Sequence, residues 1–258
     1  MTELAIESKN LSYSIGTIKI LDQCSIQIKK STIMCIIGAN GCGKTTLLNC
    51  LLGFYDVPRE TIFINGTDIR KLTRSQIAKN VSYVQQISQN DSNLEVYDYL
   101  SLGRIAHKKL YQKLDAQDKE IIDKIAHDTG ITKYLHKSLL YLSGGEKQLV
   151  MIAKALVQDT EIIIMDEPSS ALDFGNQAVL MQQLKKMNQA GKTIIFTTHN
   201  PNHALALNSD VCIMNKGVIQ TIGKATDCIC PSVLKDIYGK GIKFISNDNT
   251  VVCSFVVD

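Results

Sequence analysis

The stretch Gly38-Ala39-Asn40-Gly41-Cys42-Gly43-Lys44-Thr45-Thr46 decides the fold of this chain. The apolar run at residues 33–37 before it predicts a buried parallel strand, and an apolar helix pattern begins at Thr45. In this order of strand, glycine loop and helix, the pattern G-x-x-x-x-G-K-[ST] binds phosphate, because backbone N–H groups and the helix dipole face the anion. We therefore expect Lys44 to pair with the outer phosphates and Thr45 to hold Mg²⁺. A tight glycine turn before a core helix is the alternative, which the flanking strand and helix disfavour.

Length and composition limit the classes of protein. The chain has 258 residues, of which 45% are hydrophobic and 21% charged, enough to bury the core of one domain with an inserted subdomain. No apolar run approaches the ~20 residues that span a bilayer, and no secretory signal is visible, so a soluble, cytosolic protein is expected. Most of the eight cysteines lie in apolar strand or helix patterns, which predicts reduced thiols. The net charge of +3 is too small and too scattered to indicate nucleic acid as a partner.

Patterns in the first third of the chain predict a small antiparallel sheet. Apolar and polar positions alternate over residues 3–28, and the strand pattern at residues 61–64 ends at the hairpin signal Asn65-Gly66. Capping-box spacing at residues 73–76 then predicts a short helix before a strand at residues 81–84.

The rest of the chain predicts an α/β fold. From Leu94 onward apolar residues recur at helical spacing, with Asp115 as an N-cap candidate, so residues 87–142 are expected to be a helical insertion. Strand patterns resume at residues 161–165, 193–196 and 211–214, with helical stretches between them. This alternation indicates βαβ crossovers and a parallel sheet.

Two carboxylates, Asp166 and Glu167, follow the apolar strand pattern that begins at residue 162. The carboxyl end of a parallel strand is the edge at which open α/β sheets bind ligands. Asp166 is suited to hold Mg²⁺ through water, and Glu167 to polarise a water that attacks the outer phosphate, which predicts ATP hydrolysis. A pair of solvated acids before Pro168 is the alternative, and the loop at residues 38–46 disfavours it.

A second glycine pair stands in Leu142-Ser143-Gly144-Gly145-Glu146-Lys147-Gln148. Ser143 is placed to cap the apolar helix that follows, so this helix N-terminus is a second candidate anion site. A plain cap explains the serine but not two glycines, which destabilise a helix unless something approaches the backbone closely.

In this order, these segments resemble the nucleotide-binding domain of ABC transporters. Residues 38–46 resemble the Walker A loop, residues 142–148 the family signature, residues 162–167 the Walker B strand and residues 170–173 the D-loop. The resemblance covers nearly the whole chain. It implies a P-loop NTPase (RecA-like) fold with an N-terminal antiparallel β subdomain and an inserted helical subdomain.

Three single residues extend the resemblance. Gln86 resembles the Q-loop glutamine, His199 the switch histidine, and Tyr13 the aromatic residue that stacks on adenine. Taken singly, Gln86 fits a polar strand end, Tyr13 half-buried sheet packing, and His199 a polar residue near a helix N-cap. The resemblance implies ATP and Mg²⁺ as cofactors, with catalysis by Glu167, His199 and Gln86, with Mg²⁺ held by Thr45, Gln86 and Asp166, and with nucleotide held by Tyr13, Gly38, Asn40, Gly41, Cys42, Gly43, Lys44, Thr45, Thr46, Ser143, Gly144, Gly145, Glu146 and Asp173.

The resemblance also implies an organisation and partners. Residues 1–258 form one nucleotide-binding domain, with an ATP-binding core at residues 1–86 and 155–225, a helical signature subdomain at 87–154 and a tail at 226–258. Two copies pair head to tail around two ATP molecules. The homodimer works on two integral-membrane permease subunits at the cytoplasmic face of the membrane, with an extracytoplasmic substrate-binding protein and without nucleic acid.

Within the family, residues 102–107 (LGRIAH) are similar to the Gly-Arg-x-Pro-His stretch of ATPases that serve importers of iron-siderophores, haem, cobalamin or molybdate. The tail at residues 231–238 is also similar to theirs. Three positions depart from the family pattern: Ala106 and Gln85 replace prolines, and Leu149 replaces an arginine. We expect an ATPase subunit of a metal-chelate or cofactor importer; a soluble ABC ATPase in iron–sulfur cluster assembly or signalling is the alternative, and a module without turnover or an exporter is less expected.

Three further expectations concern single positions. His199 and His203 stand four residues apart, but Pro201 indicates that a helix only starts there and no third ligand accompanies them, so zinc is not expected. The helical insertion is expected to dock on the permease through Tyr97, Leu100 or Arg104.

Cys42 lies beside a helix N-terminus and a lysine, which predicts a thiol pKa below the usual ~8.5 and ready alkylation without nucleotide. The alternative is a side chain that points into the core and stays inert.

Overall fold

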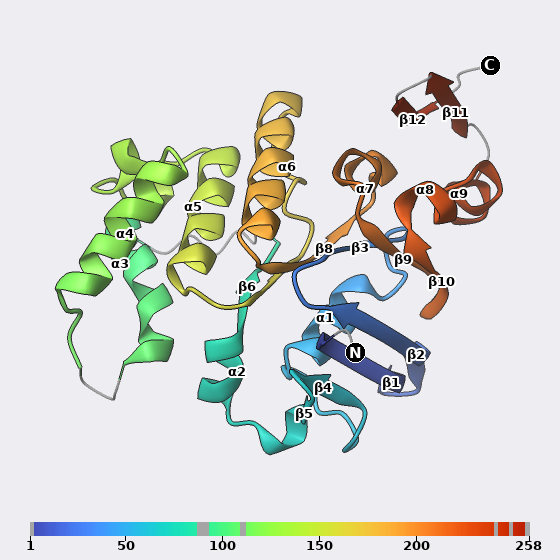
Figure 1. The fold of residues 1–258 in the computed structure, drawn as a ribbon, viewed down its shortest axis with the longest axis horizontal. Helices are drawn as coiled ribbons and strands as arrows, with labels where there is room; N and C mark the ends of the chain where they lie inside the picture. Colours follow the sequence, from blue (N-terminus) through green and yellow to red (C-terminus); the bar gives the residue numbers. More distant parts are fainter. Residues whose placement is uncertain (1–2, 87–92, 109–111, 240–241, 248–249, 256–258) are drawn as a thin grey trace. The chain divides into compact units, whose positions relative to one another are not determined.

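The computed structural model describes residues 3–86, 93–108, 112–239, 242–247 and 250–255. The chain divides into two compact units, one made of residues 1–72 with 181–258 and the other of residues 73–180. Figure 1 shows the ribbon coloured along the sequence. The segment predicted as a helical subdomain, residues 87–154, falls within the second unit together with a strand on either side of it.

The first unit begins with an antiparallel sheet. Its strands are β1 (Leu4–Ile15), β2 (Ile18–Lys29), β4 (Ile62–Ile64) and β5 (Thr67–Asp68), in the order β2-β1-β4-β5. Alternate residues of β2, among them Cys24, Ile26 and Ile28, are buried, as in a sheet that covers the core with one face. The predicted small antiparallel sheet is confirmed.

The first unit also holds the parallel strands that carry the glycine loop. β3 (Ile33–Ile37) pairs in parallel with β8 (Thr193–Thr198) and β9 (Asp210–Asn215), and β10 (Val218–Lys224) pairs antiparallel with β9. All five residues of β3 are buried, as expected of a strand covered on both faces. The helices α1 (Lys44–Leu51) and α7 (Pro201–Leu207) follow β3 and β8 along the chain.

The tail of the first unit is folded. It contains α8 (Ala225–Cys228), α9 (Pro231–Tyr238) and a hairpin of β11 (Ile242–Asn247) and β12 (Thr250–Phe255). The Asn202 amide of α7 donates to the Cys253 carbonyl at 3.1 Å and accepts from the Cys253 N–H at 2.7 Å. One side chain therefore pairs with β12 as a neighbouring strand would, and attaches the hairpin to α7.

The second unit combines a parallel strand pair with a helical cluster. β6 (Val81–Val84) and β7 (Ile162–Met165) pair in parallel. Figure 1 shows α3, α4 and α5 side by side. The helical segments of the unit are α2 (Arg74–Asn80), α3 (Val96–Ser101), η2 (Leu102–His107), α4 (Ala116–Asp128), η3 (Thr132–Tyr134), η4 (Leu139–Tyr141) and α5 (Gly144–Val157), while α6 (Phe174–Gln189) continues past residue 180 into the first unit.

Local capping signals set where these helices start. Thr73, Asp115 and Ser143 each form a full capping box with the residue three positions later, which confirms all three predicted starts. The cluster packs around side chains that are wholly removed from solvent, including Val96, Leu100, Ile122, Val150 and Val157. The predicted helical insertion is confirmed for its described residues; residues 87–92 and 109–111 lie outside them.

The LGRIAH motif packs against the last turn of α5. A Cβ on Gly103 would lie 2.7 Å from the Lys154 carbonyl oxygen. Arg104 donates from Nη1 to the Val157 carbonyl and from Nε to Asp118, both at 2.9 Å. The motif therefore satisfies carbonyls that the end of a helix leaves without partners.

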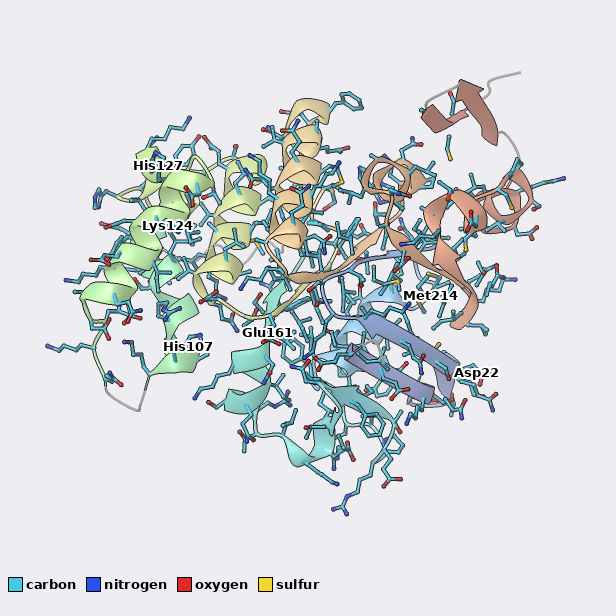
Figure 2. The ribbon with its side chains drawn as sticks, viewed as in Figure 1. Asp22, His107, Lys124, His127, Glu161 and Met214 are labelled. Atoms are coloured by element: carbon cyan, nitrogen blue, oxygen red, sulfur yellow. The ribbon has the colours of Figure 1, made fainter. Side chains whose placement is uncertain are left out.

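His107, labelled in Figure 2, continues this contact: its Nε2 lies 2.7 Å from the Gln158 carbonyl oxygen. Leu100 and Arg104 are buried, so the expectation that they dock a partner is wrong, whereas the half-buried Tyr97 stays a predicted docking residue. The exposed apolar side chains of this segment are instead Leu102 and Ile105.

None of the helices in the described part of the chain combines the length and hydropathy that crossing a bilayer requires.

Candidate functional site

The glycine loop joins β3 to α1 in the predicted strand–loop–helix order. Gly43 has a φ of +103°, and a Cβ there would lie 3.0 Å from a Leu21 methyl and 3.2 Å from the Ile20 carbonyl oxygen. Glycine is therefore required by both the backbone conformation and the packing of β2 against the loop. Because the N-cap residue is glycine, no side chain caps α1, and its first N–H groups suit an anion.

Lys44 lies across this loop. Its Nζ donates to the carbonyls of Gly38 at 2.9 Å and Ala39 at 3.2 Å, and the residue is only 5% exposed. The loop's own carbonyls thus hold the ammonium group where a phosphate in the loop would meet it. Thr45 is exposed and Thr46 half-buried in the first turn of α1, and Asn40 and Gly41 form the exposed tip of the loop.

Cys42 points away from this exposed tip. It is 5% exposed, and its Sγ lies 2.5 Å from where a Cβ on Gly38 would be. The same point is 2.5 Å from the carbonyl oxygen of Met214, the β9 residue labelled in Figure 2. This burial disagrees with the expectation of ready alkylation and matches the inward-facing alternative, because the turn between Gly41 and Gly43 directs the side chain toward β9.

His199 follows the last residue of β8. Because β3 and β8 are parallel with Ile37 opposite Thr198, His199 comes at the same strand edge as Gly38, the first residue of the loop. The histidine is exposed. The structure thus brings His199 and the glycine loop to one edge of the first unit.

Tyr13 forms an aromatic pair that the sequence pattern did not indicate. Its ring stacks on Tyr55 with centroids 4.8 Å apart and planes 5° apart. Tyr13 lies opposite Leu21 in the β1–β2 register, and Leu21 contacts the loop at Gly43. One face of Tyr13 is therefore covered by Tyr55.

In the second unit, the two predicted carboxylates follow β7. Asp166 is 1% exposed, and its N–H donates to the Val84 carbonyl of β6 at 2.8 Å. Glu167 is half-buried and has a φ of +45°, a conformation that costs free energy for a residue with a Cβ and clusters at functional sites. Val84 pairs with Met165, so the exposed Gln86 comes at the same strand edge as the carboxylates.

The second glycine pair opens α5 behind the predicted Ser143 cap. Ser143 Oγ accepts from the Glu146 N–H at 3.3 Å, and the Glu146 carboxylate accepts from the Ser143 N–H at 2.7 Å. Hydrogen bonds from Tyr134 and Ser143 lower the pKa of Glu146 to about 2. Glu146 is thus ionised as part of the cap. Tyr134 and Ser143 together organise the helix start, because both donate hydrogen bonds to the Glu146 carboxylate.

The fold itself does not require these two glycines. A Cβ on Gly144 would lie 3.7 Å from Ala171, and one on Gly145 would lie 3.5 Å from Leu172, both ordinary contacts, and neither φ is positive. Two glycines lower the stability of the helix, and no packing within the unit requires them.

Asp173, the next predicted residue, caps α6 by accepting from the Asn176 N–H at 2.8 Å.

The sequence model of the ABC transporter family matches residues 21–170, more than half of the chain. This chain belongs to the ABC transporter family. It is an ATP-binding ATPase of the transport-coupled ABC type.

Relatives within the ABC transporter family match along nearly the whole chain. The iron(3+)-hydroxamate import ATP-binding protein FhuC of Bacillus subtilis is 31% identical over 251 residues, which cover 97% of this chain and 93% of the relative. The vitamin B12 import ATP-binding protein BtuD of Vibrio atlanticus is 30% identical over 238 residues, 90% of this chain and 93% of the relative. A solved ABC transporter assigned to the metal-chelate type, in an inward-facing conformation, superposes with a TM-score of 0.84 at 25% identity and covers 99% of this chain and 97% of its own.

The residues predicted to hold Mg²⁺ carry suitable chemical groups. Thr45 in the first unit has a hydroxyl, and Gln86 and Asp166 in the second have an amide oxygen and a carboxylate, which are the kinds of hard oxygen ligand that Mg²⁺ prefers. Lys44 and the N-terminus of α1 supply positive potential for phosphates. In the described part of the chain, the structure shows no group of three or more histidine, cysteine or acidic residues arranged for a metal.

Two of the residues that organise the sites escaped sequence reasoning for different reasons. Tyr55 stacks on Tyr13 from 42 positions away, and no local pattern links such residues. His203 stands four residues after His199, and this spacing gives no signal that its ring contacts Thr198 and Asn200.

Proposed function

We propose that this chain is the ATP-hydrolysing subunit of an importer for a metal chelate or related cofactor, of the iron-siderophore, haem, cobalamin or molybdate class. The strained Glu167 beside the buried Asp166 at the end of β7 carries the proposal of hydrolysis. The substrate class is supported by the relatives, which include import ATP-binding proteins for iron(3+)-hydroxamate, petrobactin and vitamin B12.

Each residue has a chemical role in this proposal. Lys44 and the N–H groups at the start of α1 bind and orient the phosphates, while Thr45, Gln86 and Asp166 hold Mg²⁺, which supplies charge neutralisation when bound. Glu167 accepts a proton from the attacking water, and His199 contacts the outer phosphate. The ring of Tyr13 binds the adenine.

The proposal includes a homodimer. Two helices in one chain begin at glycines, α1 behind its loop and α5 at Gly144-Gly145, and the two glycines of α5 have no packing reason within their unit. A head-to-tail pair would use both, with α1 of one copy and α5 of the other on the same nucleotide. The pair works on two permease subunits at the cytoplasmic membrane face, and a substrate-binding protein delivers the cargo.

A module of iron–sulfur cluster assembly or signalling is not favoured, because the named relatives are import and transport proteins. A module without turnover is not favoured either, because both Glu167 and His199 are present.

Substrate uptake tests the proposal. Cells that carry Glu167→Gln in place of the native chain are compared with wild-type cells for uptake of a ferric hydroxamate, haem, cobalamin and molybdate. We expect one of the four uptakes to be lost, with normal iron–sulfur enzyme activity when iron is supplied as a simple salt. Retention of all four uptakes with loss of iron–sulfur enzyme activity would instead support the assembly module.

A further inference from the structure

His203 is a buried histidine whose two ring nitrogens both contact residues next to His199. It lies in α7 and is 7% exposed. Its Nδ1 is 2.9 Å from Thr198 Oγ1, and its Nε2 is 3.4 Å from Asn200 Nδ2. Thr198 and Asn200 are the residues immediately before and after His199.

The hydrogen bonds around the ring fix its tautomer. Asn200 Oδ1 accepts from the Asn202 N–H at 3.0 Å, so the amide nitrogen of Asn200 faces the ring and donates to Nε2. In a neutral ring Nδ1 then carries the proton and donates to Thr198 Oγ1. The same oxygen accepts from the Asn200 N–H at 3.0 Å, which closes a small network over the turn that holds His199.

The environment keeps this ring neutral. Burial, with a smaller contribution from His199, lowers the pKa of His203 to about 4. A protonated ring would turn an N–H toward the donor group of Asn200, so the network requires the neutral form. Because both nitrogens are occupied within the turn, the pair His199 and His203 is not a metal site despite its helical spacing.

We propose that His203 is a positioning residue for His199. By holding the side chains of Thr198 and Asn200 on both sides of His199, it fixes where the exposed imidazole projects from the strand edge that it shares with the glycine loop. This inference rests on the proposed function, in which His199 contacts the outer phosphate. A residue that acts in this way affects the hydrolysis step and leaves nucleotide binding by the loop unchanged.

A double-mutant cycle tests the proposal in the full chain. ATP turnover and KM are measured for the wild type, His203→Leu, His199→Ala and the double variant, with folding checked by thermal unfolding and ATP binding by calorimetry. We expect His203→Leu to lower kcat about 10-fold with KM within about twofold, because a small misplacement of a reacting group slows the chemistry. In the His199→Ala background the same change has no further effect on kcat, because there is no imidazole left to position.

Two further variants serve as a conservative substitution and a control for the double-mutant cycle. His203→Gln retains an acceptor for Asn200 and is expected to keep more turnover than His203→Leu; it also replaces the leucine variant in the cycle if that one does not fold. His127→Leu, a change at an exposed histidine of α4, is the matched control and keeps wild-type turnover.

The outcomes separate this inference from the function on which it rests. Equal losses of kcat in both backgrounds, or a loss of ATP affinity that accounts for the slower turnover, would overturn the positioning role and leave the proposed function intact. Wild-type turnover in His199→Ala would remove His199 from the proposed reaction, and the positioning role with it.

Discussion

Lys44 is the residue on which nucleotide affinity depends most directly. Its ammonium group lies against the carbonyls of Gly38 and Ala39, inside the loop that is expected to take the phosphates. Lys44→Ala removes this charge, so we expect ATP affinity to fall by at least about 10-fold, as for a lost charge-assisted hydrogen bond. Calorimetric titration measures it, and an unchanged Kd would show that the loop does not bind phosphates through this lysine.

The buried His203 gives the protein a specific dependence on pH. Its pKa is about 4 in the folded chain and 6.5 in its ordinary environment, so between these values the unfolded state binds more protons. The free energy of unfolding therefore falls as the pH falls from 6.5 to 4. His203→Leu should lack this part of the slope. Urea unfolding at a series of pH values compares the two proteins, and parallel pH profiles would contradict the assignment.

Thiol reactivity should differ between the buried Cys42 and Cys230, which lies at a helix start. Cys230 is the N-cap residue of α9, and hydrogen bonds from the Ser232 side chain and the Val233 backbone lower its pKa. Cys42 is buried against Gly38. We expect maleimide to modify Cys230 well before Cys42 in the folded protein, as followed by peptide mass analysis. Faster modification of Cys42 would mean that its side chain faces the solvent.

Among the elements, η2 is joined to α4 by the buried ion pair of Arg104 and Asp118, and to α5 by the hydrogen bond from Arg104 to the Val157 carbonyl. Asp118 is 1% exposed; burial opposes its ionisation, but hydrogen bonds from Lys108, the Asp115 backbone and Arg104 hold its pKa well below the usual range. Arg104→Ala leaves this charge partly unpaired, which should lower the free energy of unfolding by about 3 kcal/mol. Ile105→Ser, at an exposed neighbour, should change it by less than about 0.5 kcal/mol. Denaturant unfolding measures both, and similar small effects would refute the buried ion pair.

The same elements show which features can be predicted from local sequence patterns and which cannot. The helix starts at Thr73, Asp115 and Ser143 were predictable because a capping box lies within four consecutive residues. The burial of Arg104 was not, because its partners Asp118 and Val157 are 14 and 53 residues away. The LGRIAH motif therefore led to the prediction of a partner surface, whereas the structure shows that Arg104 of this motif packs inside its own unit.

On the scale of the whole molecule, the order of motifs allowed the fold to be predicted. The strand–loop–helix order lies within the single stretch of residues 33–51, and the two carboxylates directly follow β7. Such local patterns have a physical cause, and the structure contains both. The folded tail, the Tyr13–Tyr55 stack and the inward turn of Cys42 depend on tertiary contacts and could not be derived from spacing.

The central claim is that this chain hydrolyses ATP with Glu167 as the general base, and ATP turnover by Glu167→Gln tests it most directly. The substitution keeps the size of the side chain and the phosphate loop but removes the base, so we expect turnover to fall by about 10²-fold or more. ATP binding should be retained, and the variant should accumulate as an ATP-bound dimer in size-exclusion chromatography. Turnover equal to that of the wild type would contradict the account.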